Sequence, residues 1–168
     1  MEEMKISVTR ARDSDASEIA ELRTCVAEHL TGRHGAGHWS SSVTEKSVLR
    51  SIRTSCVLVA RNGPGIIGTL RLATKKPWAI DLAYFTRVSR ALYLHDMAVL
   101  PDLQGRGIGR RLIEEAKEVA RAWPSDALRL DAYDHAAGAG VFYANCGFLK
   151  VGDKVYRGVP LVYYELVL

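Results

Sequence analysis

A glycine-rich segment between an apolar run and an amphipathic stretch constrains this chain more than any other feature. It reads Gln104-Gly105-Arg106-Gly107-Ile108-Gly109-Arg110-Arg111. The apolar run at 91–99 predicts a buried central strand, and the apolar positions of 107–123 trace one face of a helix. Glycines let the backbone turn sharply and bring several N–H groups together, beside the positive end of a helix dipole. The segment therefore predicts an anion-binding turn between a strand and a helix.

This turn lacks the signatures of two common phosphate-binding loops, which limits the kind of anion it can bind. A Walker-type phosphate loop ends in Gly-Lys-Ser/Thr, whereas this turn ends in Gly109-Arg110-Arg111. A dinucleotide fingerprint counted from Gly105 needs a third glycine where Arg110 stands. With Arg106, these arginines form a single focus of positive charge, which suits a small phosphate-bearing cofactor.

Composition limits the class of protein. The chain has 168 residues, 48% of them hydrophobic and 25% charged, which fits one globular domain over 1–168. The net charge of +4 is mild and lacks a basic stripe interleaved with aromatics, so we expect no nucleic-acid partner. The start lacks a signal-peptide pattern and no apolar run could span a membrane, so we expect a soluble, cytoplasmic protein without a membrane partner.

The cysteines and histidines indicate no metal site. Cys25, Cys56 and Cys146 are widely spaced and form no CxxC pair, and no histidines cluster at metal-ligand spacing. We therefore expect reduced core cysteines and no bound metal.

The rest of the sequence predicts strands mixed with helices. Runs of β-like residues predict strands at 5–12, 56–60, 66–73, 127–133, 148–157 and 161–168. Apolar positions at helical spacing predict helices after Asp13-Ser14-Asp15, over 43–54 and over 137–146. A hairpin turn is expected at Asn62-Gly63-Pro64-Gly65. The order is hairpin strands first and then a β-α-β-α-β run, which is a mixed α/β fold.

Three local signals carry finer expectations. Glu18 is placed for a reciprocal bond to the helix start at Asp13-Ser14-Asp15. The segment Thr31–His38 is too rich in glycine to be helical. Residues 75–90 predict a partly ordered excursion.

Three motifs in the same order resemble those of the GNAT superfamily. Gln104, Gly107 and Gly109 satisfy its Q/R-x-x-G-x-G/A pyrophosphate loop. The stretch Leu94–Pro101 resembles the family's fourth strand, and Phe142–Phe148 resembles its Tyr-x-x-x-Gly-Phe signature. A single glycine loop is weak evidence, but the order and separation of all three motifs are specific.

This resemblance implies both a fold and an activity. The fold would be α/β (α+β), with a mixed, mostly antiparallel central sheet of about seven strands, splayed in the middle, and helices on both faces. The activity would be an N-acetyltransferase that moves an acetyl group from the co-substrate acetyl-CoA to a primary amine. In the family the amine attacks directly and the reaction passes through a tetrahedral intermediate.

The family pattern also implies the residues that hold acetyl-CoA. Main-chain groups of Met97, Ala98 and Val99 would pair with the pantetheine arm like an added strand. The N–H of Met97 would polarise the thioester carbonyl and stabilise the oxyanion. The pyrophosphate would lie on the turn, through Gln104, Gly105, Arg106, Gly107, Ile108, Gly109 and Arg110.

Four side chains are candidates for proton transfer. Tyr143 matches the family's general acid, which protonates the departing CoA thiolate; core packing is its alternative role. The amine arrives protonated, and Asp131 is the first candidate for its base because some members carry a glutamate there. His95 and Asp96 come next, and side-chain alternation along a strand lets only one of them face the cleft. A hydrogen-bonded structural role is the alternative for the carboxylates.

One position departs from the family pattern. Many members have a cofactor-contacting asparagine where this chain has Ala136. The preceding His135 is a candidate replacement, and an exposed histidine at a helix start is the alternative.

The acceptor is the least specified part. In the family it binds near segments that correspond here to 34–42 and 75–88, which contain Trp39, Trp78 and Asp81 among others. Aromatics and an acid suit a small cationic or amphipathic amine, whereas packing over the sheet is the alternative. We therefore expect a small-molecule amine. A protein N-terminal or lysine acetyltransferase and a non-catalytic acyl-CoA sensor stay open, as does a homodimer through Val159–Leu168.

Overall fold

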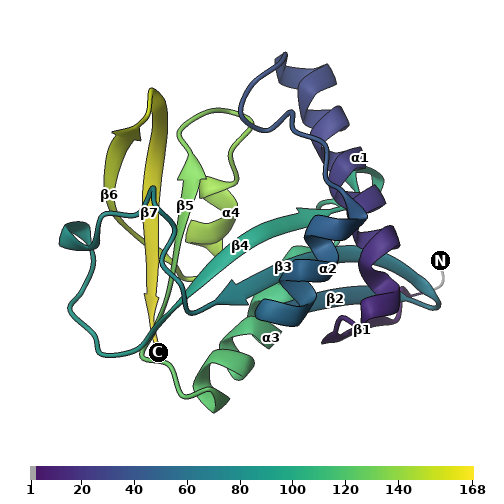
Figure 1. Cartoon of the computed structure of the whole chain (residues 1–168), viewed down its shortest axis with the longest axis horizontal. Helices are drawn as coiled ribbons and strands as arrows, with labels where there is room; N and C mark the ends of the chain where they lie inside the picture. The colour runs from purple at the N-terminus through teal and green to yellow at the C-terminus, as the bar shows by residue number, and fades with distance from the viewer. Residues whose placement is uncertain (1–2) are drawn as a thin grey trace. The chain divides into compact units, whose positions relative to one another are not determined.

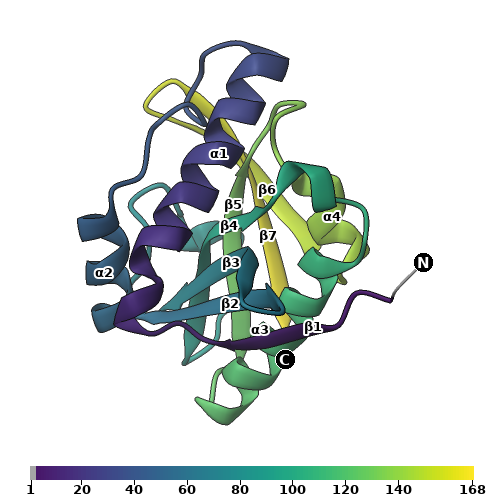
Figure 2. The same ribbon diagram turned by 90° about the vertical axis from the view of Figure 1, so that its right-hand side faces the viewer.

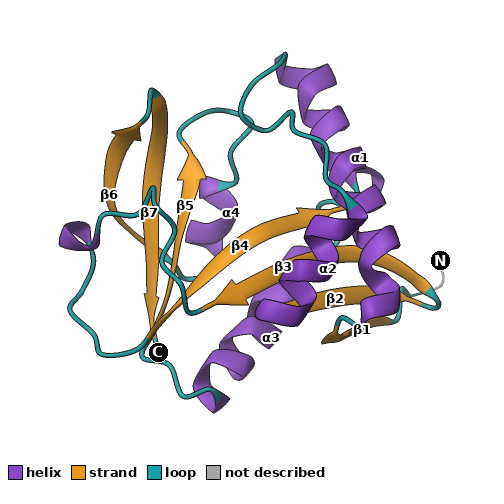
Figure 3. Cartoon of the chain, viewed as in Figure 1, coloured by secondary structure: helices purple, strands orange, loops and turns teal. Residues whose placement is uncertain are grey.

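The structure, a computed structural model, describes residues 3–168 (Figure 1). Its strands form one seven-stranded sheet in the order β1-β2-β3-β4-β5-β7-β6. They are β1 Ile6–Arg10, β2 Cys56–Asn62, β3 Gly65–Ala73, β4 Ala91–Val99, β5 Ala127–Tyr133, β6 Leu149–Tyr156 and β7 Val159–Val167. The α-helices are α1 Ala16–His34, α2 Glu45–Thr54, α3 Ile108–Ala122 and α4 Gly140–Asn145 (Figure 3).

The sheet is mixed and mostly antiparallel, which confirms the predicted fold class. The ladders β1/β2, β2/β3, β5/β7 and β6/β7 are antiparallel, and β4 runs parallel to β5. A parallel neighbour needs a crossover, and α3 provides it between β4 and β5.

The chain divides into two compact units. The first contains the chain up to Leu72 together with His95–Ala116, and the second contains Ala73–Leu94 together with Lys117–Leu168. The strand β4 therefore begins in the second unit and ends in the first.

The first unit has helices on both faces of its strands. Ile19 and Leu22 of α1 and Val48 of α2 are buried against Val57 and Val59 of β2. On the opposite face, Ile108 and Leu112 of α3 approach Gly68 of β3. Figure 2 shows α1 and α2 covering the strands from one side.

The predicted bond from Glu18 to the helix start is wrong. The Glu18 carboxylate instead accepts a hydrogen bond from the Ile66 N–H at 2.8 Å. The residue that bonds back is Asp15, which accepts from the Arg12 N–H at 2.8 Å and pairs with Arg61 at 2.7 Å. A short 3-10 turn over Asp13–Asp15 moves the cap one turn toward the N-terminus, so the Glu18 side chain is available to bond to β3.

The prediction that Thr31–His38 is non-helical is wrong for its first half, because α1 continues to His34. The Thr31 hydroxyl donates to the Ala27 carbonyl at 2.8 Å, which keeps the chain in helical register. Gly35 ends the helix with a φ of 81° and donates to the Thr31 carbonyl at 2.9 Å. A positive φ is what a helix C-terminus needs from glycine, and Gly32 is not used for this.

The second unit is built on β5 and the β6–β7 hairpin. The register places Asp131 of β5 opposite Tyr163 of β7, and Ile80, Phe85 and Tyr93 form a core around Tyr163. The expected excursion at 75–90 contains one 3-10 turn over Leu82–Tyr84.

The ladder between β4 and β5 is short. It joins Ala91–Tyr93 to Ala127–Arg129, although β4 has nine residues and β5 has seven. The β4–β5 pairing ends at Tyr93, and β4 continues into the first unit. The expected splay between the two strands stays a prediction.

The helix α4 is shorter than the predicted 137–146. A turn delays its start, because the His135 carbonyl accepts from the Gly138 N–H at 2.8 Å and the His135 Nδ1 accepts from the Ala137 N–H at 2.9 Å. Among residues 3–168, no helix is both long enough and apolar enough to cross a membrane.

Candidate active site

The turn before α3 has the backbone of an anion site. Gly105 and Gly107 have φ values of 77° and 84°, a region that side chains other than glycine rarely adopt. A Cβ built on either glycine meets nothing within 4 Å, so the surface of the turn is open. The first bond of α3 runs from the Arg111 N–H to the Gly107 carbonyl at 3.0 Å. Since the first N–H groups of a helix have no partner within it, those around Ile108 point out of the helix start.

Packing fixes this turn against the sheet. Ile108 and Leu112 are 1% and 0% exposed. A Cβ on Gly68 would lie 3.1 Å from Ile108 and 3.0 Å from Leu112, so glycine permits the close approach of β3 to α3. The Gln104 side chain donates to the Val99 carbonyl at 3.2 Å and ties the turn to the end of β4. The helix start is therefore held rigidly at one end of the strand.

The predicted cofactor residues all lie in the first unit. Arg106 and Arg110 are exposed around the turn, as their expected role toward phosphate requires. On β4, Ala98 is buried in the core with α1, and Met97 and Val99 are partly buried. The roles of these residues stay predictions.

The strand β4 is irregular just before Met97. Asp96 has a φ of 55°, in the left-handed region that asparagine and aspartate tolerate better than most residues. Strict side-chain alternation, on which the expected opposite orientation of His95 and Asp96 rests, does not apply at such a residue.

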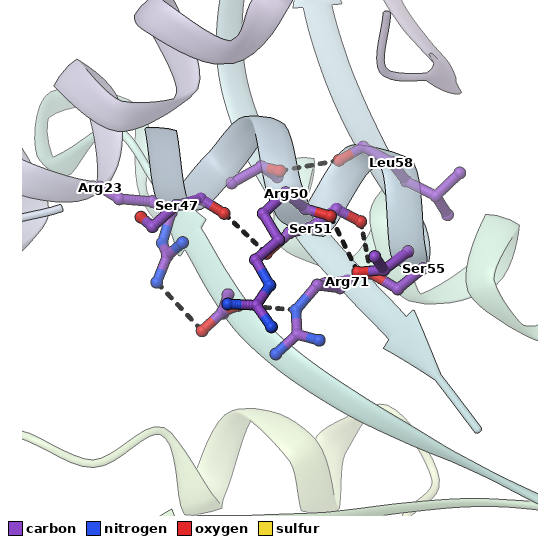
Figure 4. A network of polar contacts seen from close by, with 10 residues as sticks. Arg23, Ser47, Arg50, Ser51, Ser55, Leu58 and Arg71 are labelled. Atoms are coloured by element: carbon purple, nitrogen blue, oxygen red, sulfur yellow. Dashed lines mark hydrogen bonds and ion pairs between the residues drawn. The ribbon is translucent and has the colours of Figure 1, made fainter. Parts of the chain in front are cut away.

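Asp96 is held by two arginines (Figure 4). Its Oδ1 accepts from Arg23 of α1 at 3.0 Å, and its Oδ2 accepts from the Nε of Arg71 of β3 at 2.8 Å. Burial alone would raise the Asp96 pKa, but the two guanidinium groups outweigh it and hold the pKa below its usual range. Asp96 is therefore ionised and engaged, which favours a structural role over that of a base.

His95 has the opposite character. Burial, followed by the charge of Arg71, lowers its pKa to about 4, so the ring is neutral near pH 7. Its Nε2 is buried without a hydrogen-bond partner among the described residues. A neutral imidazole can accept a proton or a hydrogen bond at this nitrogen.

Tyr143 and Asp131 lie in the second unit. Tyr143 of α4 is 7% exposed and packs against the rings of Phe148 and Tyr164. Burial and then the nearby Asp131 raise its pKa far above the usual value, so the phenol stays protonated. Burial also raises the Asp131 pKa, and no cation offsets this. A less acidic carboxyl is a better proton acceptor.

The structure accounts for much of the expected acceptor region by packing. The rings of Phe85 and Tyr84 pack against Tyr163, tilted and edge-to-face, with centroids 5.3 and 5.4 Å from it. Asp81 pairs with Lys154 at 2.6 Å. Trp78 is 81% exposed.

In the other segment, the Trp39 Nε1 donates to the Gly35 carbonyl at 3.0 Å. At the position that departs from the family, His135 uses its Nδ1 locally, and Ala136 is exposed.

Sequence reasoning missed Arg23 and Arg71. They lie 73 and 25 residues from Asp96, and no motif marks either one. Among residues 3–168, no group of three His, Cys, Asp or Glu side chains is placed to hold a metal ion.

Known structures of similar fold include several acetyltransferases. YncA of Salmonella typhimurium, solved with its cofactor acetyl-CoA, is 19% identical, with 97% of this chain and 94% of that chain covered and a TM-score of 0.71. The PaiA N-acetyltransferase of Thermoplasma acidophilum, in complex with coenzyme A, is 15% identical, with 98% and 100% covered and a TM-score of 0.77. A GNAT-family acetyltransferase of Streptococcus pneumoniae is 18% identical, with 98% and 99% covered and a TM-score of 0.72. At these identities the likeness concerns the fold.

The family itself is shown by sequence. The family model described as an acetyltransferase (GNAT) domain matches residues 53–150, which is more than half of the chain. No curated protein matches the chain significantly. The chain belongs to the GNAT acetyltransferase family, and it is an enzyme of the acyltransferase class.

Proposed function

We propose that this enzyme moves the acetyl group of acetyl-CoA onto the primary amine of a small molecule. The observation that carries the proposal is the open turn directly before α3, where Gly105 and Gly107 have positive φ and a Cβ on either would meet no atom within 4 Å. A diphosphate accepts hydrogen bonds from several N–H groups and is attracted by the helix dipole, and this turn offers both. Arg106 and Arg110 add charge beside it.

The end of β4 would align the acetyl group. We propose that main-chain groups of Met97, Ala98 and Val99 pair with the pantetheine arm, as an added strand does. The irregular backbone at Asp96, with a φ of 55°, supports this because it interrupts regular pairing just before Met97. The Met97 N–H would then donate to the carbonyl oxygen as negative charge develops on it.

We propose Asp131 as the base that takes the amine proton, directly or through water. Burial raises its pKa and no ion pair to it is found within residues 3–168, whereas the charge of the ionised Asp96 is compensated by two arginines. The neutral His95, with its unpartnered Nε2, is the second candidate. Direct attack by the neutral amine then passes through a tetrahedral intermediate.

We propose Tyr143 as the group that assists the departing thiolate. Because its pKa is raised, the phenol keeps its proton and donates a hydrogen bond. A thiol with a pKa of about 8.5 is already a good leaving group, so the contribution is modest.

We also propose that the two compact units form one catalytic domain over 1–168, of which residues 1 and 2 lie outside the described part. The family match at 53–150 supports this, since it includes segments of both units.

A screen of amines that detects released CoA thiol tests the proposal. We expect CoA release with at least one small primary amine, and a rise in melting temperature with acetyl-CoA alone. Binding without release for every small amine and peptide would favour an acyl-CoA sensor. Release only with peptides would favour a protein acetyltransferase.

A further inference from the structure

The arginines around Asp96 carry more charge than the carboxylate neutralises. Arg23 and Arg71 share the one carboxylate, so the cluster keeps one positive charge. Burial lowers the pKa of Arg23, the charge of Asp96 partly offsets this, and the smaller effect of the nearby Arg71 lowers the pKa again. Guanidinium groups are not deprotonated in proteins, so the arginines cannot lose charge. A second anion would relieve the repulsion between Arg23 and Arg71.

The cluster also has unused hydrogen-bond donors. A guanidinium has five N–H groups, and Arg23 uses its Nη2 and Arg71 its Nε on Asp96. Among the described residues, neither arginine has another hydrogen-bond acceptor. The three side chains stay 22%, 23% and 29% exposed, so a small ligand can reach them from solvent.

A third arginine points toward the same place. Figure 4 shows the Arg50 side chain extending from α2 toward Arg23 and Arg71. The cluster is thus approached from α1, α2 and β3. Guanidinium groups favour carboxylates, and Asp96 already accepts one N–H from each of Arg23 and Arg71.

The cluster lies directly beside the proposed reaction centre. Asp96 precedes Met97, whose N–H we propose as the donor to the thioester carbonyl. An acceptor whose anionic group binds the arginines would therefore be anchored by the partners of the residue that directly precedes this donor.

We propose that the acceptor is an amine that also carries a carboxylate, such as an amino acid, and that Arg23 and Arg71 bind this carboxylate. The inference rests on the proposed function and specifies its substrate class. The partly exposed arginines make the site selective by charge, since an amine without a carboxylate gives them no second anion to bind.

The test compares acceptors matched in shape. CoA release is measured for L-leucine, L-leucinamide and isoamylamine, and for the corresponding phenylalanine set. We expect kcat/KM at least about 10-fold higher for the acid than for both neutral analogues of the best set. The amine of the acid is intermediate in basicity between those of its amide and its decarboxylated analogue, so amine pKa alone cannot produce this order.

Substitution of each arginine tests whether it binds the carboxylate of the acceptor. Arg71→Gln and Arg23→Gln should each raise KM for the acid about 10-fold or more and leave KM for the amide within about 2-fold. Arg71→Lys should restore part of the loss, because it returns the charge without the fork. Arg53→Gln is the matched control, since Arg53 lies on α2 and pairs with Asp13 at the surface.

A measurement on the unsubstituted enzyme covers the case in which a variant fails to fold. Raising the ionic strength should raise KM for the acid and leave KM for the amide unchanged.

The outcomes separate the two proposals. Equal or better use of the neutral amines, or a KM for the acid that is indifferent to both substitutions and salt, overturns the carboxylate site while the proposed function stands. If no amine releases CoA and acetyl-CoA does not raise the melting temperature, the proposed function fails, and this inference fails with it.

Discussion

Two arginine–carboxylate clusters in this enzyme differ in how completely their polar groups are satisfied. In the second unit, Arg129 pairs with Glu165 at 2.9 Å, and their side chains are 6% and 3% exposed. The other nitrogens of Arg129 donate to the Tyr93 hydroxyl and the Thr86 carbonyl, and Glu165 also accepts from the Thr86 N–H. In the first unit, two arginines share Asp96. They keep unused N–H donors, and their side chains are partly exposed to solvent.

The difference separates a scaffold from a site. In the buried pair, one charge of each sign is balanced and all three guanidinium nitrogens of Arg129 donate a hydrogen bond, so little is left to bind a ligand. A partly exposed cluster with excess charge and unused donors can still bind an anion from solvent. The same contrast distinguishes the closed cores of both units from the open turn at Gly105 and Gly107.

The largest expected effect comes from opening the closed cluster. Arg129→Met leaves the Glu165 carboxylate buried without its cation and should lower the free energy of unfolding by about 3–5 kcal/mol. Urea denaturation measures this. Arg121→Met, which removes an exposed pair with Glu118, should cost less than about 1 kcal/mol. Similar losses for both variants would remove the distinction between the two kinds of cluster.

Closing the open turn should abolish cofactor binding. Gly107→Asp places a negative side chain on a backbone with a φ of 84°, where the diphosphate is expected. We expect the acetyl-CoA affinity to fall about 100-fold or more, measured by isothermal titration. Gly63→Asp is the control, because Gly63 also has positive φ and open surroundings but lies in the β2–β3 hairpin. Near-normal affinity of the Gly107 variant would refute the assignment of the turn.

Asp131→Asn tests a carboxylate that has no cation beside it. Because burial raises the Asp131 pKa, its basic form is lost as pH falls through that raised pKa, and the rate should fall with it. The variant should lower kcat about 10- to 50-fold and remove this acid limb from the pH–rate profile. An unchanged profile would pass the role of base to His95.

Tyr143→Phe tests a hydroxyl inside an otherwise closed aromatic cluster. Removing it keeps the packing against Phe148 and Tyr164 and should lower kcat about 10-fold or less, with acetyl-CoA affinity unchanged. Stopped-flow and steady-state measurements of CoA release distinguish kcat from binding. Full activity would assign Tyr143 to the core alone.

The smallest effect concerns His95, whose Nε2 has no hydrogen-bond partner among residues 3–168. Its pKa is about 4 in the folded chain and about 6.5 when unfolded, so between these values the unfolded chain binds the extra proton. Above pH 6.5 His95 is neutral in both states and does not lower the free energy of unfolding. As the pH falls from 6.5 toward 4, protonation of His95 in the unfolded chain lowers the free energy of unfolding. Between pH 7.5 and 5, His95→Asn should lose about 1 kcal/mol less than the parent, after allowance for the ring's partial exposure. Exposed His29→Asn is the control, and equal losses in all three proteins would contradict the burial of a neutral ring.

The sequence predicted best what the main chain determines locally. The strands at 91–99 and 127–133 and the turn between Gln104 and the start of α3 appear where expected, because glycine, proline and apolar period act within a few residues. The end of α1 could not be predicted because Gly32 and Gly35 offer the same signal, and only the structure shows that Gly35 has the positive φ and donates to the Thr31 carbonyl.

Side-chain partners from distant segments could not be predicted. Glu18 bonds to Ile66 in place of its own helix start, and Asp96 meets Arg23 and Arg71 only when α1 and β3 pack beside β4. Pattern reasoning predicts which residues are polar and exposed on a helix, but not which polar group in a later strand they meet. The candidate base was left open for the same reason.

The most direct test of the account follows the main-chain amides of the turn. In 15N-labelled enzyme, CoA should shift the amide resonances of Gly105, Gly107, Ile108 and Gly109 strongly, whereas pantetheine, which lacks the diphosphate, should leave them nearly unchanged and bind at least about 100-fold more weakly. If CoA and pantetheine bound equally well, or if CoA left these four amides unshifted, the turn would not be the diphosphate site.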